Sequence, residues 1–299
     1  MNSNETLPFR CGFVALVGRP NVGKSTLLNH LIGQKISITS KKAQTTRQRI
    51  TGIRTESNVQ YVFVDTPGFQ TYHKSALNDV LNRSVKDTLS HVDCVIFVIE
   101  AMRWTEADKE LLPLLPAARP IILAINKCDK AKDKFALAEF VRRVQHDFAF
   151  AGVEVVSAKE GQRLETLLTL VCPHLPVSVP LYPDDAITDK SERFLAAEIV
   201  REKLFRYLGE ELPYALHVDV EQFELDGSLR RIHVAILVDK IGQKSIVIGK
   251  GGAKLKKIGT EARMDMEKLF QGNVFLQVWV KVKSGWADEV RFLKEFGVH

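Results

Sequence analysis

The stretch that decides the fold is Gly18-Arg19-Pro20-Asn21-Val22-Gly23-Lys24-Ser25-Thr26. A glycine, four residues and then Gly-Lys-Ser form the pattern of a phosphate-binding loop. Residues 11–17 before it are apolar and predict a buried strand, and residues 26–32 predict the helix that follows. Glycines let backbone N–H groups approach a phosphate chain, and a helix N-terminus favours an anion. We expect all nine residues to bind a nucleotide, with Lys24 at the β- and γ-phosphates and Ser25 on Mg²⁺.

Composition limits the class of protein. The chain has 299 residues, which suits two domains better than one. No apolar run reaches the roughly 18 residues of a membrane-spanning helix, and residues 1–10 lack the apolar core of a signal peptide. The 4 cysteines show no spacing typical of a metal site or a disulfide framework. These features predict a cytoplasmic protein, and the net charge of +6 favours an anionic partner.

Two further segments predict a switch that responds to the γ-phosphate. The polar segment Gln44-Thr45-Thr46-Arg47 offers a threonine that could close over this phosphate and ligate Mg²⁺, and the pattern leaves open which of the two does so. Asp65-Thr66-Pro67-Gly68 follows a strand-like run at 60–64, which suits Asp65 for holding Mg²⁺ through a water molecule. The backbone N–H of Gly68 could then contact the γ-phosphate, a contact that is lost on hydrolysis.

The segment Asn126-Lys127-Cys128-Asp129, after an apolar strand at 120–125, discriminates between bases. A carboxylate at Asp129 can accept from the ring N–H and the exocyclic amine of guanine, whereas adenine presents the opposite pattern at its ring nitrogen. Two charge-assisted hydrogen bonds of about 1.5–3 kcal/mol each favour guanine by about two to four orders of magnitude. We expect Lys127 to stack on the base and Asn126 to tie the loops together. Beyond the next strand, Ser157-Ala158-Lys159 places the Ala158 N–H for donation to the guanine carbonyl.

The order of these motifs predicts a P-loop α/β domain with a mostly parallel sheet flanked by helices. Strands alternate with helices, which we expect at 105–115 and 133–149, and each polar motif follows a strand. The carboxyl ends of the strands form the ligand-binding edge of such a sheet. Four prolines between 173 and 183 then favour an extended connector. We place the domains at residues 1–180 and 181–299.

The sequence pattern of residues 181–299 predicts an RNA-binding module. Its expected order is helix, strand, strand, helix, helix, strand, which resembles an α+β KH domain of type II with Gly249-Lys250-Gly251-Gly252 as its GXXG loop. Residues 240–260 contain six lysines and no acidic residue, and Lys250, Lys254 and Lys257 are expected to meet phosphates. Ile248, with Ile246, is expected to form an apolar wall for bases. Single-stranded RNA is favoured because its bases must be unpaired to enter such a groove.

The chain as a whole resembles the Era family of bacterial GTPases, whose G domain is of the TrmE-Era-EngA type. The resemblance rests on the motifs at 18–26, 44–47, 65–68, 126–129, 157–159 and 249–252, and on Trp279-Val280-Lys281-Val282-Lys283-Ser284-Gly285-Trp286. It implies a Mg²⁺-dependent GTPase that binds single-stranded rRNA near the 3′ end of 16S rRNA and assists 30S subunit assembly and rRNA processing. It also implies a cytoplasmic monomer with peripheral association with the inner membrane, and it favours Thr46 over Thr45 as the Mg²⁺ ligand.

Two positions bear on the mechanism. Phe69 stands where Ras-type enzymes carry the glutamine that orients water, which predicts slow intrinsic hydrolysis with the water held by backbone groups or a partner. Asn21 resembles an asparagine that ligates a monovalent cation in related enzymes, so K⁺ could accelerate turnover. Phe69 also leaves an alternative open, namely an RNA-binding chaperone whose G domain senses the nucleotide but hardly hydrolyses it. A tandem-G-domain factor is excluded by the single phosphate loop, and nothing after residue 183 suggests the β-barrels of a translocating translation factor.

Overall fold

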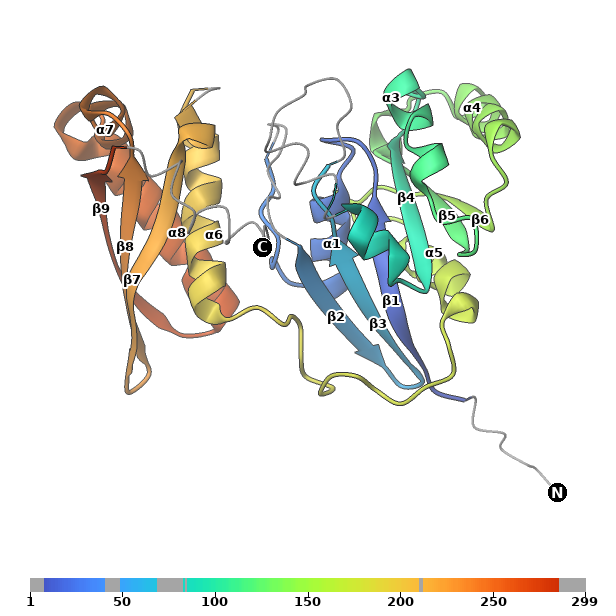
Figure 1. Ribbon diagram of the computed structural model, residues 1–299, viewed down its shortest axis with the longest axis horizontal. Helices are drawn as coiled ribbons and strands as arrows, with labels where there is room; N and C mark the ends of the chain where they lie inside the picture. The colour runs from blue at the N-terminus through green and yellow to red at the C-terminus, as the bar shows by residue number, and fades with distance from the viewer. Residues whose placement is uncertain (1–7, 41–48, 69–82, 84, 210–211, 285–299) are drawn as a thin grey trace. The chain divides into compact units, whose positions relative to one another are not determined.

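A computed structural model describes residues 8–40, 49–68, 83, 85–209 and 212–284 of the chain. The predicted residues Thr46 and Phe69 lie outside these ranges. The chain forms two compact units (Figure 1). The boundary between them that follows the proline-rich connector lies between Asp189 and Lys190. This division comes later than the boundary at 180/181 that the prolines suggest.

The first unit is built on a six-stranded sheet in the order β2-β3-β1-β4-β5-β6. β2 pairs with β3 in an antiparallel manner, and the other neighbouring strands are parallel. The strands are β1 (Arg10–Val17), β2 (Ile50–Glu56), β3 (Val59–Asp65), β4 (Cys94–Glu100), β5 (Ile121–Asn126) and β6 (Gly152–Val155). The P-loop α/β fold predicted from the motif order is therefore confirmed.

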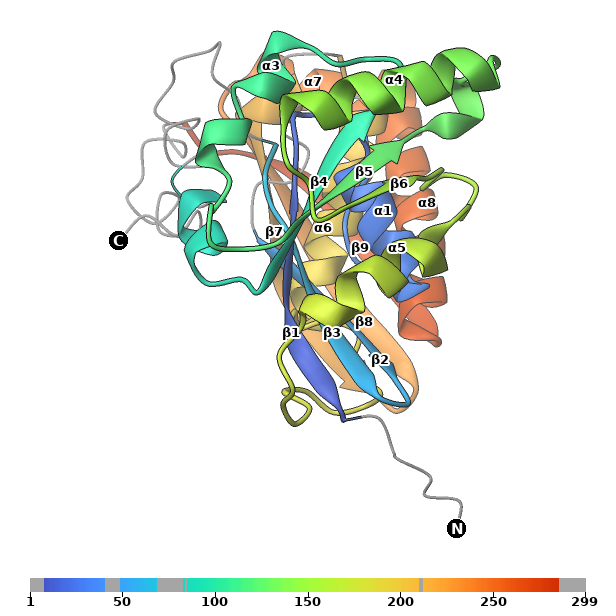
Figure 2. The ribbon, with the colours of Figure 1, turned by 90° about the vertical axis from the view of Figure 1, so that its right-hand side faces the viewer.

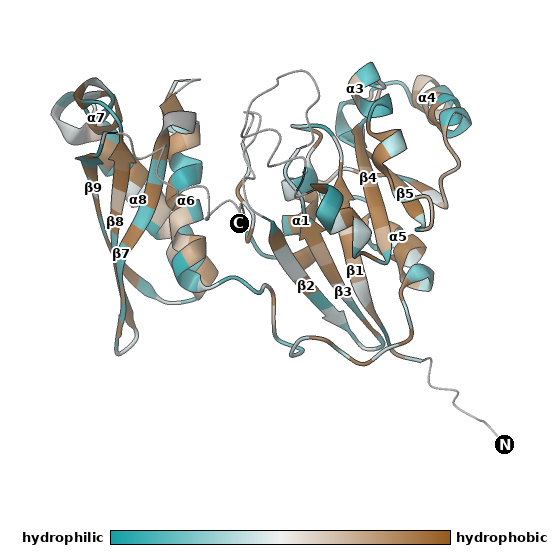
Figure 3. Ribbon diagram, in the orientation of Figure 1, coloured by the Kyte–Doolittle hydropathy of each residue, from teal (hydrophilic) through white to brown (hydrophobic). Residues whose placement is uncertain are grey.

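Apolar side chains on both faces of this sheet explain why helices cover both sides. Gly52 of β2 faces Leu28 of α1 (Lys24–Ile32), and Gly152 of β6 faces Leu170 of α5 (Leu164–Val171). On the other face, Phe97 of β4 belongs to the same buried cluster as Phe140 of α4 (Lys134–Asp147). Figure 2 shows the helices arranged about the sheet, and Figure 3 shows how hydrophobic the strands are.

The segment predicted as one helix at 105–115 is shorter and broken. It forms α3 (Glu106–Lys109) and, after two further residues, the 3₁₀ turn η1 (Leu112–Leu114). Pro113 has no backbone N–H to continue an α-helix, which accounts for the break. Other short 3₁₀ turns are η2 (Cys128–Lys130), η3 (Cys172–His174) and η4 (Leu212–Ala215).

The connector after η3 is bonded to the first unit through Gln60 of β3. The Gln60 side chain is fully buried, and its Oε1 accepts from the backbone N–H groups of Leu181 at 2.8 Å and Tyr182 at 3.0 Å. Its Nε2 donates to the Tyr182 carbonyl oxygen at 2.8 Å. Farther on, the Ile53 N–H donates to the Ile187 carbonyl oxygen at 2.9 Å. These bonds explain why the compact unit continues past residue 180.

The second unit has the predicted order of a type II KH domain, which is confirmed. Its sheet runs β7-β8-β9, with β7–β8 antiparallel and β8–β9 parallel. α6 starts as predicted after Ser191, whose Oγ accepts from the Phe194 N–H at 3.2 Å. The elements are α6 (Glu192–Tyr207), β7 (Leu216–Asp226), β8 (Leu229–Val238), α7 (Ile241–Ile248), η5 (Lys250–Gly252), α8 (Ala253–Phe270) and β9 (Asn273–Val282). Within the described ranges, no helix is long and apolar enough to cross a membrane.

Candidate nucleotide and RNA sites

The phosphate loop lies between β1 and α1, and two of its glycines are required by their surroundings. Gly18 and Gly23 have positive φ angles of 155° and 107°. A Cβ on Gly18 would lie 2.3 Å from the Val98 carbonyl oxygen, and one on Gly23 would lie 2.3 Å from Asn126 Nδ2. Neither contact is sterically allowed, so the loop can pass this close to β4 and to the base-recognition loop only with glycine at both positions.

The Lys24 side chain is hydrogen-bonded to the backbone of the phosphate loop. Its Nζ donates to the carbonyl oxygens of Gly18 at 2.8 Å and Arg19 at 3.1 Å, and the residue is only 7% exposed. Burial lowers the pKa of Lys24 to about 8, although the nearby Asp65 carboxylate acts in the opposite direction. The ammonium group is thus held at the centre of the loop, where phosphate oxygens would replace the missing solvation.

Oxygen atoms suited to Mg²⁺ converge beside the loop. Ser25 Oγ donates to Asp65 Oδ2 at 2.7 Å, and Ser37 Oγ donates to the same oxygen at 2.9 Å. Mg²⁺ prefers such hard oxygen donors and is usually held by one or two protein groups together with phosphates and water. Ser25 and Asp65 therefore fit the ion, whereas Ser37 was not anticipated because it lies in a polar stretch without a motif.

The loop that follows Asp65 lies directly against the phosphate loop. Thr66 Oγ1 donates to the Leu16 carbonyl oxygen at 2.7 Å, which fixes the loop to β1. A Cβ on Gly68 would lie 2.9 Å from the Pro20 Cα, so glycine is needed for this approach. The backbone of Gly68 is accordingly near the phosphate loop, as its predicted role at the γ-phosphate requires.

Asn126 joins three of the predicted motifs. Its Nδ2 donates to the Val22 carbonyl oxygen at 2.8 Å, and its Oδ1 accepts from the Ala158 N–H at 2.9 Å. Nearby, Ser157 Oγ donates to Asp129 Oδ1 at 2.6 Å and orients this carboxylate. The Ala158 N–H, expected on the guanine carbonyl, is bonded to Asn126, so donation to guanine requires that this bond be shared or exchanged.

The remaining residues of the two base motifs have different surroundings. Lys127 Nζ donates to the Asn21 carbonyl oxygen at 2.6 Å and pairs with Glu100 at 2.9 Å. Lys159 is exposed at its side chain and pairs with Glu160 at 2.6 Å. Cys128 is partly buried, and burial raises the pKa of its thiol. Only the Lys127 side chain of these three is tied to the phosphate loop.

The GXXG loop of the second unit depends on glycine conformations. Gly249, Gly251 and Gly252 have positive φ angles of 73°, 58° and 77°. A Cβ on Gly249 would lie 2.8 Å from the Lys254 Cβ, whereas nothing lies within 4 Å of one built on Gly251 or Gly252. The tip of the loop is therefore open to solvent, and the Lys250 side chain is exposed beside it.

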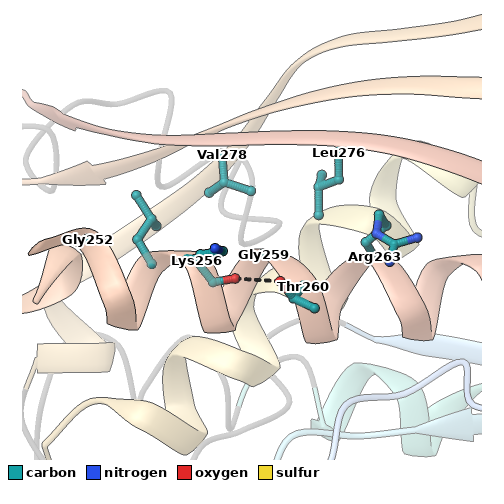
Figure 4. Close-up of a pocket in the computed structure, with 8 residues that line it drawn as sticks. Gly252, Lys256, Gly259, Thr260, Arg263, Leu276 and Val278 are labelled. Atoms are coloured by element: carbon teal, nitrogen blue, oxygen red, sulfur yellow. Dashed lines mark hydrogen bonds between the residues drawn. The ribbon is translucent and has the colours of Figure 1, made fainter.

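A groove of about 400 Å³ runs along α8 and β9 (Figure 4). Figure 4 shows Leu276 and Val278 pointing from β9 toward α8, where Lys256 and Arg263 lie at the groove. The lining is Gly252, Leu255, Lys256, Gly259, Thr260, Arg263, Leu276 and Val278. Apolar side chains and cations thus share one concave surface, which suits bases and phosphates of a single strand.

The groove coincides only in part with the predicted RNA surface, whose residues stay predictions. Ile248 and Ile246 do not line it, because the apolar wall comes from α8 and β9, and Ile246 is 51% exposed on α7. Lys257 lies over the Tyr207 ring of α6 at 4.7 Å and does not line the groove either. Leu276 and Val278 line the groove and were not among the predicted residues, although their spacing of two in β9 places them on one face of the strand.

Comparison with known proteins identifies the family of each domain. Residues 13–127 match the family described as 50S ribosome-binding GTPase, and residues 211–287 match the KH domain family. GTPase Era of Chromobacterium violaceum is 74% identical over 291 residues, covering 97% of this chain and 98% of that protein. The chain belongs to the Era family of GTPases. GTPase Era of Neisseria meningitidis serogroup A is 66% identical over 292 residues, covering 97% and 95%.

Solved Era structures have the same fold over nearly the full length. A variant of Aquifex aeolicus Era bound to GDP and AlF₄⁻ has a TM-score of 0.91 at 36% identity, covering 97% of this chain and 99% of that one. Era in complex with MgGDPNP and nucleotides 1506–1542 of 16S ribosomal RNA has a TM-score of 0.90 at 36% identity, with the same coverage. The enzyme class predicted from the motifs, a GTPase, is confirmed by the family. The roles of individual residues remain predictions.

Proposed function

We propose that this member of the Era family couples GTP binding and hydrolysis to the binding of single-stranded rRNA at the 3′ end of 16S rRNA, and that it thereby assists 30S subunit assembly and rRNA processing. The observation that carries the proposal is the presence in one chain of interlocked guanine-nucleotide loops and an open GXXG loop beside a basic and apolar groove. The solved relative that holds both MgGDPNP and 16S rRNA nucleotides supports this reading.

In the proposed reaction each residue has a limited task. Lys24 would neutralise the β- and γ-phosphates, and Asp129 would select guanine. Ser25 would hold Mg²⁺ directly and Asp65 through water, and the ion would offset charge on the transferred phosphoryl group. The Gly68 N–H would bind the γ-phosphate. Because the chain has Phe69 where a water-orienting glutamine would stand, we expect slow hydrolysis until RNA or the 30S particle completes the site.

K⁺ is a further proposed cofactor, through Asn21. This residue has a left-handed backbone with φ of 64° and is exposed. GTP turnover should therefore be faster in K⁺ than in Na⁺. Asn21→Ala should remove that difference, and an unchanged ratio of the two rates would exclude the role.

The coupling is tested by binding purified protein to 3′-end 16S rRNA and to a scrambled RNA, in GDP and in a non-hydrolysable GTP analogue. Tighter and sequence-selective binding with the analogue is expected. Equal binding in both nucleotides would show that RNA binding by the isolated protein is not gated. Single-turnover hydrolysis with and without RNA or 30S subunits separates the proposal from a chaperone that hardly hydrolyses GTP, because only the GTPase is accelerated.

The proposed setting is the cytoplasm, with the protein acting as a monomer. Sedimentation of the protein with and without nucleotide tests the monomeric state. Peripheral association with the inner membrane is tested by flotation with vesicles of anionic lipids, in which co-migration is the expected result.

A further inference from the structure

The side chain of Arg19 in the phosphate loop is bound to α3. Its Nε lies 3.0 Å from Asp108 Oδ1 and 3.1 Å from Oδ2. Asp108 is fully buried, and its Oδ2 also accepts from the backbone N–H of Thr105 at 3.0 Å and from Thr105 Oγ1 at 2.7 Å. The Asp108 carboxylate thus caps a short helix and, at the same time, holds a residue of the phosphate loop.

A second carboxylate, Glu100, lies between the phosphate loop and the base-recognition loop. It follows Ile99 at the carboxyl end of β4 and pairs with Lys127 at 2.9 Å. Its Oε2 is also 3.7 Å from Arg19 Nη2, which has no hydrogen-bond partner among the described residues. Burial alone would raise the pKa of Glu100, but Lys127, Lys130 and Arg103 together lower it, so the carboxylate stays ionised.

The two cations act on the same short piece of backbone. Arg19 precedes Asn21 by two residues, and Lys127 Nζ donates to the Asn21 carbonyl oxygen at 2.6 Å. Asn21 and Lys127 are both left-handed, with φ of 64° and 65°, a conformation that costs free energy for residues other than glycine. Such backbone persists only where its surroundings hold it, and here the surroundings include the buried Asp108 and the partly buried Glu100.

We propose that Asp108 and Glu100 are positioning residues of the nucleotide site. Asp108 holds Arg19, Glu100 holds Lys127, and these cations keep residues 19–21 in the conformation that binds a nucleoside diphosphate. The diphosphate is common to GDP and GTP. Loss of either carboxylate therefore lowers the affinity for both nucleotides to the same degree. The inference concerns the GTPase site alone and does not depend on RNA binding.

The test is a double-mutant cycle at Arg19 and Asp108, read by GDP and GTP-analogue affinity. We expect Asp108→Asn and Arg19→Ala each to raise both dissociation constants about tenfold, equivalent to about 1.4 kcal/mol. The double variant should be no weaker than either single variant, because the two residues act through one contact. KM for GTP should rise in both variants, and Arg19→Lys, which keeps the charge, should recover part of the affinity.

A matched control separates positioning from helix capping. Thr105→Val removes a hydroxyl from the same cap without touching Arg19, so it should lower the unfolding midpoint and leave nucleotide affinity unchanged. Glu100→Gln provides a second variant. It should lower the affinity for both nucleotides without affecting the α3 cap. Three results would each overturn the proposal. These are wild-type affinity in Asp108→Asn, a rise in the dissociation constant of the double variant equal to the product of the two single rises, or an equal loss of affinity in Thr105→Val.

Discussion

The lowered pKa of Lys24 makes nucleotide affinity depend on pH. In the protein without nucleotide, burial lowers the pKa of Lys24 to about 8. Bound phosphates favour the ammonium form and raise that pKa again, so binding above pH 8 must take up a proton. At pH 7 most molecules already carry the proton, whereas at pH 9 about one in eleven does. Affinity for GDP should therefore fall about tenfold from pH 7 to pH 9, which corresponds to about 1.4 kcal/mol.

The assay is titration calorimetry with GDP at pH 7, 8 and 9, at constant ionic strength. Repeating the titration at pH 9 in buffers of different ionisation enthalpy gives the number of protons taken up, which should approach one. Lys24→Arg is the matched control, because a guanidinium keeps its charge across this range. Its residual pH dependence reports every other titrating group, including guanine itself. A wild-type affinity that falls no more than that of Lys24→Arg, without proton uptake, would refute the reasoning.

Three further predictions concern other parts of the chain. Asp129→Asn should weaken GDP by about two to four orders of magnitude and favour xanthine nucleotides, measured by competition binding, because an amide can donate to the additional carbonyl of xanthine. Lys250→Glu with Lys254→Glu should weaken RNA binding and reduce the slope of log affinity against log salt by about 0.7 for each lost phosphate contact, and an unchanged slope would place the RNA elsewhere. Gln60→Leu should lower the free energy of unfolding by about 1–3 kcal/mol in urea titrations, because it removes the partners of partly buried backbone groups of Tyr182. Wild-type stability would show that this contact contributes little.

The parts of the nucleotide site that follow buried strands could be predicted from the sequence. Lys24, Asp65 and Asn126 lie where apolar runs end, and parallel strands bring those ends to one edge of a sheet. The glycine positions were also predictable, because the spacing of Gly18 and Gly23 is part of the phosphate-loop motif. Local pattern suffices in these cases because each residue is marked by its place in a short motif, although Val98 and Asn126, which exclude a side chain at the two glycines, lie far away in the chain.

Contacts between segments far apart in the chain could not be predicted in this way. Gln60 stands in an apolar run and gives no sign that its amide will bond the connector at 181 and 182. Asp108 has the spacing of a helix cap, which conceals its second contact with Arg19. Glu100 did carry a signal, since it is an acid at the carboxyl end of a buried strand, but its partners depend on strand order.

The two binding sites differ in how firmly their loops are held. In the nucleotide site, the phosphate loop is bonded to Asn126 and Lys127, so most of its geometry exists before a ligand binds. At the RNA loop, positions Gly251 and Gly252 have no neighbour within 4 Å of an added Cβ. A preorganised loop loses little entropy on binding. The nucleotide site is therefore largely formed in advance, whereas the tip of the GXXG loop is open to a ligand that approaches its backbone.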